Sequence, residues 1–465
     1  MMEKIQLYSR IPSISEVDHW LQTNKLPFGK IVRSEVQAIL SELRTEIQNI
    51  QNESTFQYEN KQEILDHILI RLIGKQYEKT SNVINATGIV VHTNLGRSPL
   101  SYEILTPLLK QWSCYTPLEY NLATGTRGER GLKIIEYLKH LSGAPDALVV
   151  NNNASAVFLM LFALAKGKEV IVSRGELVEI GGSFRIPDIM RAADVKLIEV
   201  GTTNRTRLSD YENAISENTV GFLKVHPSNY VIHGFVEEVS TGALAELARK
   251  HDLKTFYDLG SGTFYKFKQP QLASILTIQQ EWNEGIDILS FSGDKLLGSV
   301  QAGIVLGKTD LITRLRKNPL YRAFRLDKIT LSILESTLIS YLEMKDYPEH
   351  NLTIQLLEQS IDVIEKRAIK VLKSLDGCLC SGWKINLIET LSLTGGGALP
   401  ELYLRSYGLL VEHPDKSANI IQKLLRESSI PIITRIENKC VILDFRTVFD
   451  EDCESVSKNL QLLCS

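Results

Sequence analysis

The strongest constraint on the fold is an alternation of short β-branched segments with helix-length segments that begins near residue 83. Seven such apolar segments occur, at 146–150, 168–173, 195–201, 221–226, 254–260, 287–293 and 302–307. Strands that alternate with helices indicate β-α-β units and a mostly parallel sheet. Parallel sheets bind ligands at the carboxyl ends of their strands, and several of these segments end in Gly, Asn, Ser or Asp. The pattern predicts an α/β protein with a polar site at one edge of its sheet.

The regions on either side of this alternation have different patterns of apolar residues. Residues 1–75 are predicted to be helical, because 34–53 and 61–75 place apolar residues three or four apart. Beyond 335, a long helical stretch precedes three strand-like segments, at 382–389, 431–437 and 439–445. We therefore predict a helical N-terminal domain at 1–75, a catalytic core at 76–335 and a small α/β domain at 336–465.

Composition excludes several classes of protein. The chain has 465 residues, 43% of them hydrophobic, and a net charge of −3, which is ordinary for a soluble globular protein. The first 75 residues hold nine Lys and Arg against ten Asp and Glu, so they form no basic arm. The longest apolar run, 156–165, is half the roughly 20 residues that span a bilayer. Six scattered cysteines and an N-terminus without a signal peptide predict a cytoplasmic protein with no metal site.

The segment SFSGDKLLGSVQAG, at 290–303, places Lys295 between two glycines after an apolar strand. Two interpretations are open from this segment alone. In the first, SGD caps a helix and Lys295 is a solvated residue of its first turn. In the second, Lys295 is a buried amine that holds a carbonyl cofactor as a Schiff base.

Two other strand ends bear on that choice. In NNNASAV, at 151–157, Asn152 or Asn153 either caps the following helix or helps its N-terminus to bind phosphate. In TFYDLGSG, at 255–262, Asp258 is either a turn residue or a buried carboxylate that needs a cationic partner such as a pyridinium. A phosphate turn, then an acid, then a lysine is the chain order of aminotransferase-like pyridoxal enzymes. This order favours the Schiff-base interpretation of Lys295.

Arginines in several loops could bind phosphate or carboxylate groups, because a planar guanidinium suits both. The candidates are Arg97, Arg127, Arg130, Arg322 and Arg325. The last two lie three positions apart and would share one face of a helix. A further polar group consists of Arg174, Glu176, Glu179 and Arg185, to which the residues alone assign no role.

Long motifs in this chain resemble those of bacterial selenocysteine synthases, the L-seryl-tRNA(Sec) selenium transferases. The resemblance runs from about residue 8 to the C-terminus and rests on INATGIVVHTNLGRSPL, NNNASAV, SRGELVEIGGSFRIPDIM, GTTNRT, KVHPSNY, DLGSG, FSGDKLLG and RAFRLDKITL. It implies the aminotransferase-like fold, known as fold type I, with pyridoxal 5'-phosphate as cofactor. It also implies a cytoplasmic, ring-shaped homodecamer whose N-terminal domain recognises tRNA.

The resemblance assigns roles to individual residues. Lys295 would be the Schiff-base lysine, Asp258 the partner of the pyridinium nitrogen, and Asp294 an active-site acid. Asn152, Asn153, Ala154 and Ser292 would complete the cofactor site. Arg97, Arg322 and Arg325 match positions that line the selenium-donor pocket, and Arg127 and Arg130 lie in a loop near the active site.

The implied reaction converts L-seryl-tRNA(Sec) to L-selenocysteinyl-tRNA(Sec) through an aminoacrylyl intermediate, with selenophosphate as donor. Near the site the chain departs from the family pattern, with Ser299 and Val300 in place of Gly and Pro, and Pro227 in place of Thr. Two alternatives therefore stay open. One is a related pyridoxal phosphate lyase that acts on a small amino acid or amino sugar, and the other is a catalytically weak tRNA-binding relative.

Overall fold

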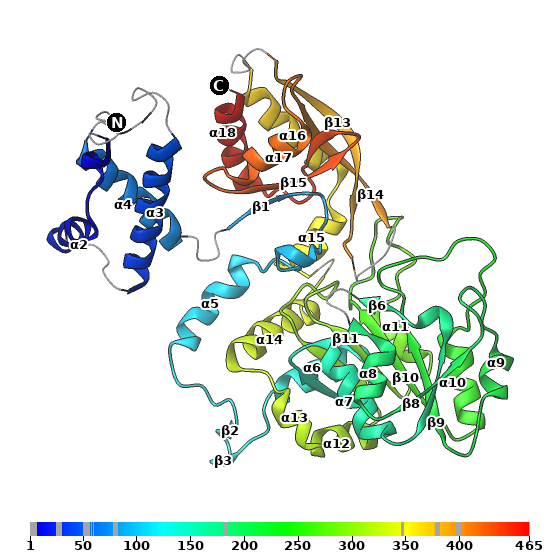
Figure 1. The fold of residues 1–465 in the computed structure, drawn as a ribbon. Helices are drawn as coiled ribbons and strands as arrows, with labels where there is room; N and C mark the ends of the chain where they lie inside the picture. The colour runs from blue at the N-terminus through cyan, green and yellow to red at the C-terminus, as the bar shows by residue number, and fades with distance from the viewer. Residues whose placement is uncertain are drawn as a thin grey trace. The chain divides into compact units, whose positions relative to one another are not determined.

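The structure is a computed structural model that describes residues 7–24, 30–49, 56, 58, 60–77, 82–180, 184–345, 348–376, 382–396 and 402–464. The chain divides into two compact units, Met1–Val83 and Ile84–Ser465 (Figure 1). No helix among the described residues is both long enough and apolar enough to cross a bilayer.

The N-terminal unit is helical, as its apolar spacing predicts. Its helices are α2 (Ile14–Thr23), α3 (Lys30–Asn49) and α4 (Lys61–Tyr77). Ser13 and Glu16 form a capping box that starts α2. Of the apolar stripe predicted on 34–53, Val36, Leu40, Leu43 and Ile47 are buried in the core of this unit, and Ile50 lies outside the described residues.

The second unit contains a seven-stranded sheet with the strand order β4-β12-β11-β10-β9-β5-β8. Its strands are β4 (Asp146–Val150), β5 (Glu169–Ser173), β8 (Lys196–Val200), β9 (Thr219–Val225), β10 (Lys254–Ser261), β11 (Ile288–Ser292) and β12 (Gly303–Gly307). All seven predicted segments form strands of this sheet. Only the β11–β12 and β12–β4 pairs are antiparallel, so the sheet is mostly parallel, as predicted.

The register of the central strands brings their carboxyl ends to one edge. Asp258 on β10 lies opposite Val225 on β9 and Ser290 on β11. The segments that follow β9 and β11 therefore meet at the end of β10. A register shift between Asp258 and Gly260 bends β10 at this point.

Helices pack on the sheet or on one another beside it, and together they bury most of its apolar side chains. These helices are α5 (Tyr102–Trp112), α6 (Leu132–Ser142), α7 (Asn153–Ala165), α8 (Ile186–Ala192), α9 (Leu208–Asn213), α10 (Thr241–Lys250), α11 (Ile278–Asn283), α12 (Thr309–Lys317), α13 (Pro319–Ala323), α14 (Lys328–Leu342) and α15 (Leu352–Glu358). Helix α7 is almost entirely apolar because it packs between the sheet and α8 and α12. Short pairs β2–β3 (Tyr120–Asn121, Thr126–Arg127) and β6–β7 (Glu179–Ile180, Phe184–Arg185) lie outside the main sheet.

A second, five-stranded sheet forms near the C-terminus, with the order β1-β15-β16-β14-β13. Its strands are β1 (Ile84–Ala86), β13 (Lys384–Leu393), β14 (Tyr403–Glu412), β15 (Ile432–Glu437) and β16 (Cys440–Asp444), with α16 (Ile361–Ser374), α17 (Ala418–Arg426) and α18 (Cys453–Cys464) packed on it. The sequence predicted β13, β15 and β16. It did not predict β14, nor that β1, from the start of the unit, pairs with β15.

Candidate active site

Lys295 lies in a turn that follows β11. No helix begins there, so the interpretation of SGD as a helix cap is wrong. The lysine is only 6% exposed. The turn is fixed by a bond from the Gly293 N–H to the Ala302 carbonyl (2.8 Å) and by the Ser98 hydroxyl, which donates to the Lys295 carbonyl (2.8 Å). The amine is therefore held inside the protein by a rigid backbone.

The far side of the lysine turn is anchored by two buried polar side chains. The Tyr341 hydroxyl and the Asn351 amide both donate to the Leu297 carbonyl, at 3.0 and 2.9 Å. Gly298 has a φ of 71°, and a Cβ atom there would overlap the Asn351 side chain. Glycine is thus required at this end of the turn.

Asp258 lies at the carboxyl end of β10 and is 2% exposed. The Asn153 amide donates to its Oδ1 atom at 2.8 Å. Burial raises the pKa of the Asp258 carboxyl, and the bond from Asn153 and the charge of Lys295 oppose that shift. Burial lowers the pKa of the Lys295 amine, and here the charge of Asp258 acts in the opposite direction. Each group thus partly stabilises the charged form of the other.

Gly260 shows how these groups converge. A Cβ atom built on it would lie 3.8 Å from Asp258 Oδ1, 3.9 Å from Lys295 Nζ and 4.0 Å from Ser228 Oγ. Three polar side chains from three strand ends therefore surround one point. Ser228 Oγ and Asn153 Oδ1 are buried and have no hydrogen-bond partner among the described residues. Because unpaired buried polar atoms are costly, these two atoms are available to a ligand.

At the start of α7 the structure confirms one of the two interpretations of the asparagine turn, the helix cap. Asn152 is the helix cap, since its side chain accepts the Ser155 N–H at 2.8 Å. Asn153 instead reaches Asp258, and Ala154 lies in the first helical turn. The helix N-terminus, whose unpaired N–H groups attract anions, thus lies beside the buried carboxylate.

Asp294 and Arg97 form an ion pair next to Lys295. Arg97 Nη1 donates to Asp294 Oδ2 at 2.7 Å, and the Ser292 hydroxyl donates to Oδ1 at 2.6 Å. Arg97 has a positive φ of 64°, and its N–H bonds the His92 carbonyl. The structure therefore brings together Arg97, Ser292, Asp294 and Lys295 from two separate loops.

The other predicted arginines divide into a group of three and a single residue. Arg127, Arg130 and Arg325 all bond the carboxylate of Glu119, at 3.1, 2.7 and 3.2 Å. Arg322 is exposed on α13. The prediction that Arg322 and Arg325 share a helical face is wrong, because α13 ends at Ala323.

The polar group around 174–185 does not form one cluster. Arg174 pairs with Glu199 at 3.3 Å, and Glu179 pairs with Arg185 at 2.7 Å. Glu176 is buried, and it accepts bonds from the Lys224 amine (3.0 Å) and the Val225 N–H (2.9 Å). Burial raises the pKa of Glu176. The contacts of Glu176 fix the end of β9. Among the described residues, the polar side chains at 174–185 thus form separate structural contacts.

Sequence reasoning missed His226, Ser228 and Glu119. The His226 N–H bonds the Asp258 carbonyl at 2.9 Å. Burial, together with the charges of Lys224 and Lys295, lowers the pKa of its side chain to about 4. His226 and Ser228 follow directly after a predicted strand, so the reasoning that singled out Asp258 could have found them. Glu119 does not follow a predicted strand, and no other sequence pattern marks it as a site residue.

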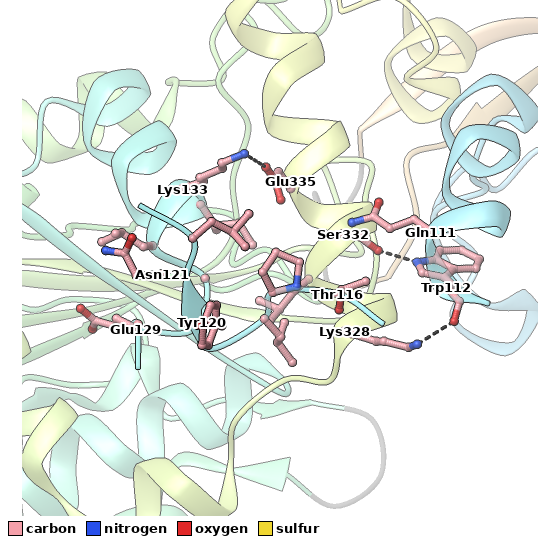
Figure 2. Close-up of a pocket in the computed structure, with 18 of the residues that line it drawn as sticks. Gln111, Trp112, Thr116, Tyr120, Asn121, Glu129, Lys133, Lys328, Ser332 and Glu335 are labelled. Atoms are coloured by element: carbon pink, nitrogen blue, oxygen red, sulfur yellow. Dashed lines mark hydrogen bonds and ion pairs between the residues drawn. The ribbon is translucent and has the colours of Figure 1, made fainter. Parts of the chain in front are cut away.

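A separate cavity of about 500 Å³ lies between α5, α6, the β2–β3 segment and α14 (Figure 2). Trp112 donates to the Ser332 hydroxyl at 2.6 Å on one wall, and Lys133 faces Glu335 on another. None of the predicted site residues lines this cavity.

The fold and the buried lysine–aspartate site define an α/β protein of aminotransferase-like fold, as predicted. Among solved structures, D-glucosaminate-6-phosphate ammonia-lyase matches with a TM-score of 0.58 and 18% identity, over 84% of this chain and 98% of that one. At this identity the likeness shows the fold alone.

Sequence comparisons show the family. The model of L-seryl-tRNA selenium transferases matches residues 83–449. The chain is 47% identical to the L-seryl-tRNA(Sec) selenium transferase of Aquifex aeolicus over 82% of this chain and 84% of that protein. It is 41% identical to that of Clostridium botulinum, over 99% of this chain and all of that protein. The chain therefore belongs to the L-seryl-tRNA(Sec) selenium transferase family.

Ser299, one of the expected departures from the family pattern, is accommodated within the core. The Ser299 hydroxyl lies 2.8 Å from that of Thr337, and both residues are buried. The Ser299 N–H bonds the Gly293 carbonyl at 2.9 Å. The serine thus adds a polar contact to the turn that carries Lys295.

Proposed function

We propose that this protein is an enzyme that converts L-seryl-tRNA(Sec) to L-selenocysteinyl-tRNA(Sec), with selenophosphate as donor and pyridoxal phosphate as cofactor. The observation that carries the proposal is the convergence of the Lys295 amine and the Asp258 carboxylate on one buried point. Membership of the family supports the substrate, since its curated members are named for selenium transfer to this seryl-tRNA.

The residues at this point fit the cofactor. Pyridoxal phosphate supplies an aldehyde that an amine can attack and a protonated ring that takes up electrons. Lys295 Nζ would bond the aldehyde carbon, and Asp258 would hold the proton on the ring nitrogen. The free Ser228 Oγ and Asn153 Oδ1 would bond polar groups of the ring. The α7 N-terminus, with Asn152, Asn153 and Ala154, would bind the phosphate.

Lys295 also has the properties of the base. Because burial lowers the pKa of its amine, Nζ can be neutral at a lower pH than in an exposed lysine. A neutral Nζ can take the α-proton of the seryl group once substrate occupies the site. Arg97, oriented by Asp294 at 2.7 Å, places a fixed positive charge beside this amine. We assign to Arg97 the binding of the anionic donor.

Covalent labelling tests the cofactor and its lysine. Protein loaded with pyridoxal phosphate should absorb visible light, and borohydride reduction should fix the mass of the cofactor on the peptide that contains Lys295. Lys295→Ala should lose this attachment and reduce the rate of selenium transfer by about 10³-fold or more. Lys308→Ala, which removes an exposed lysine near the same sheet, is the matched control. Label on another lysine, or none on the wild type, would refute the assignment.

We further propose that the N-terminal unit recognises the tRNA. Its charge is near neutral, so recognition would depend on the shape of the RNA more than on a basic surface. Since Met1–Val83 is a compact unit, a chain that begins at Ile84 should keep the cofactor absorbance and lose binding to tRNA(Sec). Equal tRNA affinity in the full and shortened chains would refute this role.

The remaining expectations of the sequence analysis also stand as proposals. They are the ring-shaped homodecamer, the cytoplasmic location, a donor-binding role for Arg322 and the three-domain division. Sedimentation of the purified protein tests the first: a species ten times the mass of one chain supports it, and a stable dimer contradicts it.

A further inference from the structure

The turn that carries Lys295 has a glycine on each side, so its own backbone restrains it weakly. These residues are Gly293 and Gly298, and Gly298 has a φ of 71°. Glycine has more backbone freedom than any other residue. The position of the Lys295 amine therefore depends on the bonds that other elements make to residues 293–299.

One face of α14 holds this turn on both sides of Gly298. The Tyr341 hydroxyl donates to the Leu297 carbonyl at 3.0 Å. Thr337 lies four positions before Tyr341, and its hydroxyl is 2.8 Å from that of Ser299. Side chains four positions apart share one face of a helix. The flexible glycine is thus bracketed by two bonds to a single helix.

Helix α14 is itself fixed in the core of the unit. Its residues Leu334 and Leu338 have no exposed surface. They belong to the same apolar cluster as Leu296 and Leu297 of the lysine turn. A bond from the turn to α14 therefore ties the turn to an element that does not shift independently of the core.

The direction of the bond between Ser299 and Thr337 follows from a third group, the Ile333 carbonyl. The Thr337 hydroxyl donates its single proton to this carbonyl at 3.0 Å. The Ser299 hydroxyl is then the donor to Thr337 Oγ1. Ser299 and Thr337 are 1% and 0% exposed, so water does not compete for the bond.

Ser299 also closes the turn through its backbone. Its N–H donates to the Gly293 carbonyl at 2.9 Å, and the Gly293 N–H donates to the Ala302 carbonyl at 2.8 Å. Lys295 lies inside the loop that the first of these bonds closes. A movement of Ser299 would therefore move the end of the loop on which the Lys295 amine is carried.

We propose that Ser299 is a positioning residue for Lys295, whose hydroxyl locks the closed turn onto α14 and so aligns the Lys295 amine with the group that the amine attacks. The inference rests on the proposed function for the identity of that group, the aldehyde of pyridoxal phosphate. A misplacement of about 1 Å can slow a reaction about 10²-fold, so the loss of this bond has a measurable effect.

The rate at which cofactor-free protein attaches added pyridoxal phosphate, followed by visible absorbance, tests the proposal. Ser299→Ala should attach the cofactor about tenfold more slowly than the wild type, which is the effect of one hydrogen bond. Ser332→Ala is the matched control. Ser332 is another buried serine of α14, but it bonds Trp112 and the Ile329 carbonyl instead of the turn (Figure 2). This control should attach the cofactor at the wild-type rate.

Variants of Thr337 test the other end of the bond. Thr337→Val removes the acceptor and leaves the buried Ser299 proton unpaired, so it should slow attachment at least as much as Ser299→Ala. Thr337→Ser keeps the hydroxyl and should attach the cofactor at the wild-type rate. The double variant Ser299→Ala/Thr337→Val should be no slower than Thr337→Val alone, because both changes remove the same bond.

Hydrogen exchange of the cofactor-free proteins provides a readout that does not depend on the cofactor. The backbone N–H groups of residues 298 and 299 should exchange about tenfold faster in Ser299→Ala than in the wild type, because the turn opens more often. Ser332→Ala should match the wild type. Unchanged exchange in Ser299→Ala would overturn the proposal.

Attachment by Ser299→Ala at the wild-type rate would also overturn it. So would equal slowing in Ser332→Ala, which would show a general loss of stability. If Ser299→Ala does not fold, the Thr337 variants decide by the same two measurements. A wild type that attaches no cofactor would instead refute the proposed function, and hydrogen exchange would still decide whether Ser299 holds the turn.

Discussion

Two groups of charged residues adjoin the start of α7, and they differ in what surrounds them. Lys295 and Asp258 are buried near strand ends. Burial raises the pKa of Asp258 and lowers that of Lys295, and both shifts favour the neutral form of the group. Glu119 and its three arginines are partly exposed, with side-chain exposures from 22% to 76%, and their opposite charges stabilise one another. The first group is held in place by the surrounding core, whereas the second is held by contacts among its own charged side chains. The proposed chemistry thus depends on the buried group, and the proposed donor binding depends on the partly exposed one.

The largest expected effect concerns the buried group. Asp258→Asn keeps the shape of the side chain but removes the charge that would hold the ring proton of the cofactor. The variant should still attach the cofactor to Lys295 and should lose about 10²–10⁴-fold in rate. Borohydride trapping and a selenium-transfer assay measure the two properties separately. The variant could instead lose cofactor attachment while each cofactor-loaded molecule keeps the wild-type rate. That result would show that Asp258 only supports the fold.

A second test uses pH on the cofactor-free protein. The pKa of His226 is lowered from 6.5 to about 4 in the fold, so an unfolded chain binds this proton at a higher pH than the folded one. Stability should therefore fall as the pH decreases from about 6.5 to about 4, and His226→Gln should remove roughly 2–3 kcal/mol of that loss. Denaturant unfolding at several pH values measures it. His140→Gln, on the exposed end of α6, is the control and should follow the wild type.

The smallest effect is expected in the group around Glu119. Arg325→Lys keeps the charge but loses the planar fork that suits a tetrahedral anion. Dehydration of the seryl group should proceed as in the wild type, while the apparent KM for selenophosphate should rise about tenfold. Single-turnover assays that follow the two half-reactions separately would show this. Arg191→Lys, in a surface pair with Asp188, should change neither.

Equal loss in both half-reactions of Arg325→Lys would place this arginine on the tRNA or the cofactor. The distinction between the two groups would then fail, since the loops would take part in the chemistry as well as in donor binding.

The same two groups differ in how far they could be predicted. The alternation of strands and helices predicted all seven strands of the main sheet, and parallel strands place Asp258 and the Lys295 turn at one edge. Burial of both residues follows from apolar strands on either side. The Glu119 cluster could not be predicted, because its partners lie 8, 11 and 206 positions away along irregular loops. Likewise, Glu176 lies in a short 3-10 helix after β5 and pairs with Lys224 on β9, which is 48 positions away.

Strand β1 has a consequence for the order in which the protein can assemble during synthesis. Ile84 pairs with Ile432, so the second sheet cannot close until the segment that contains β15 has left the ribosome. The main sheet is complete at Gly307 and can fold earlier, since domains form as their residues emerge. A chain interrupted after Gly307 would hold every strand of the catalytic sheet and would leave β1 as an unpaired edge, open to association with another chain. Closure of the second sheet thus shows that translation has passed β15 and β16.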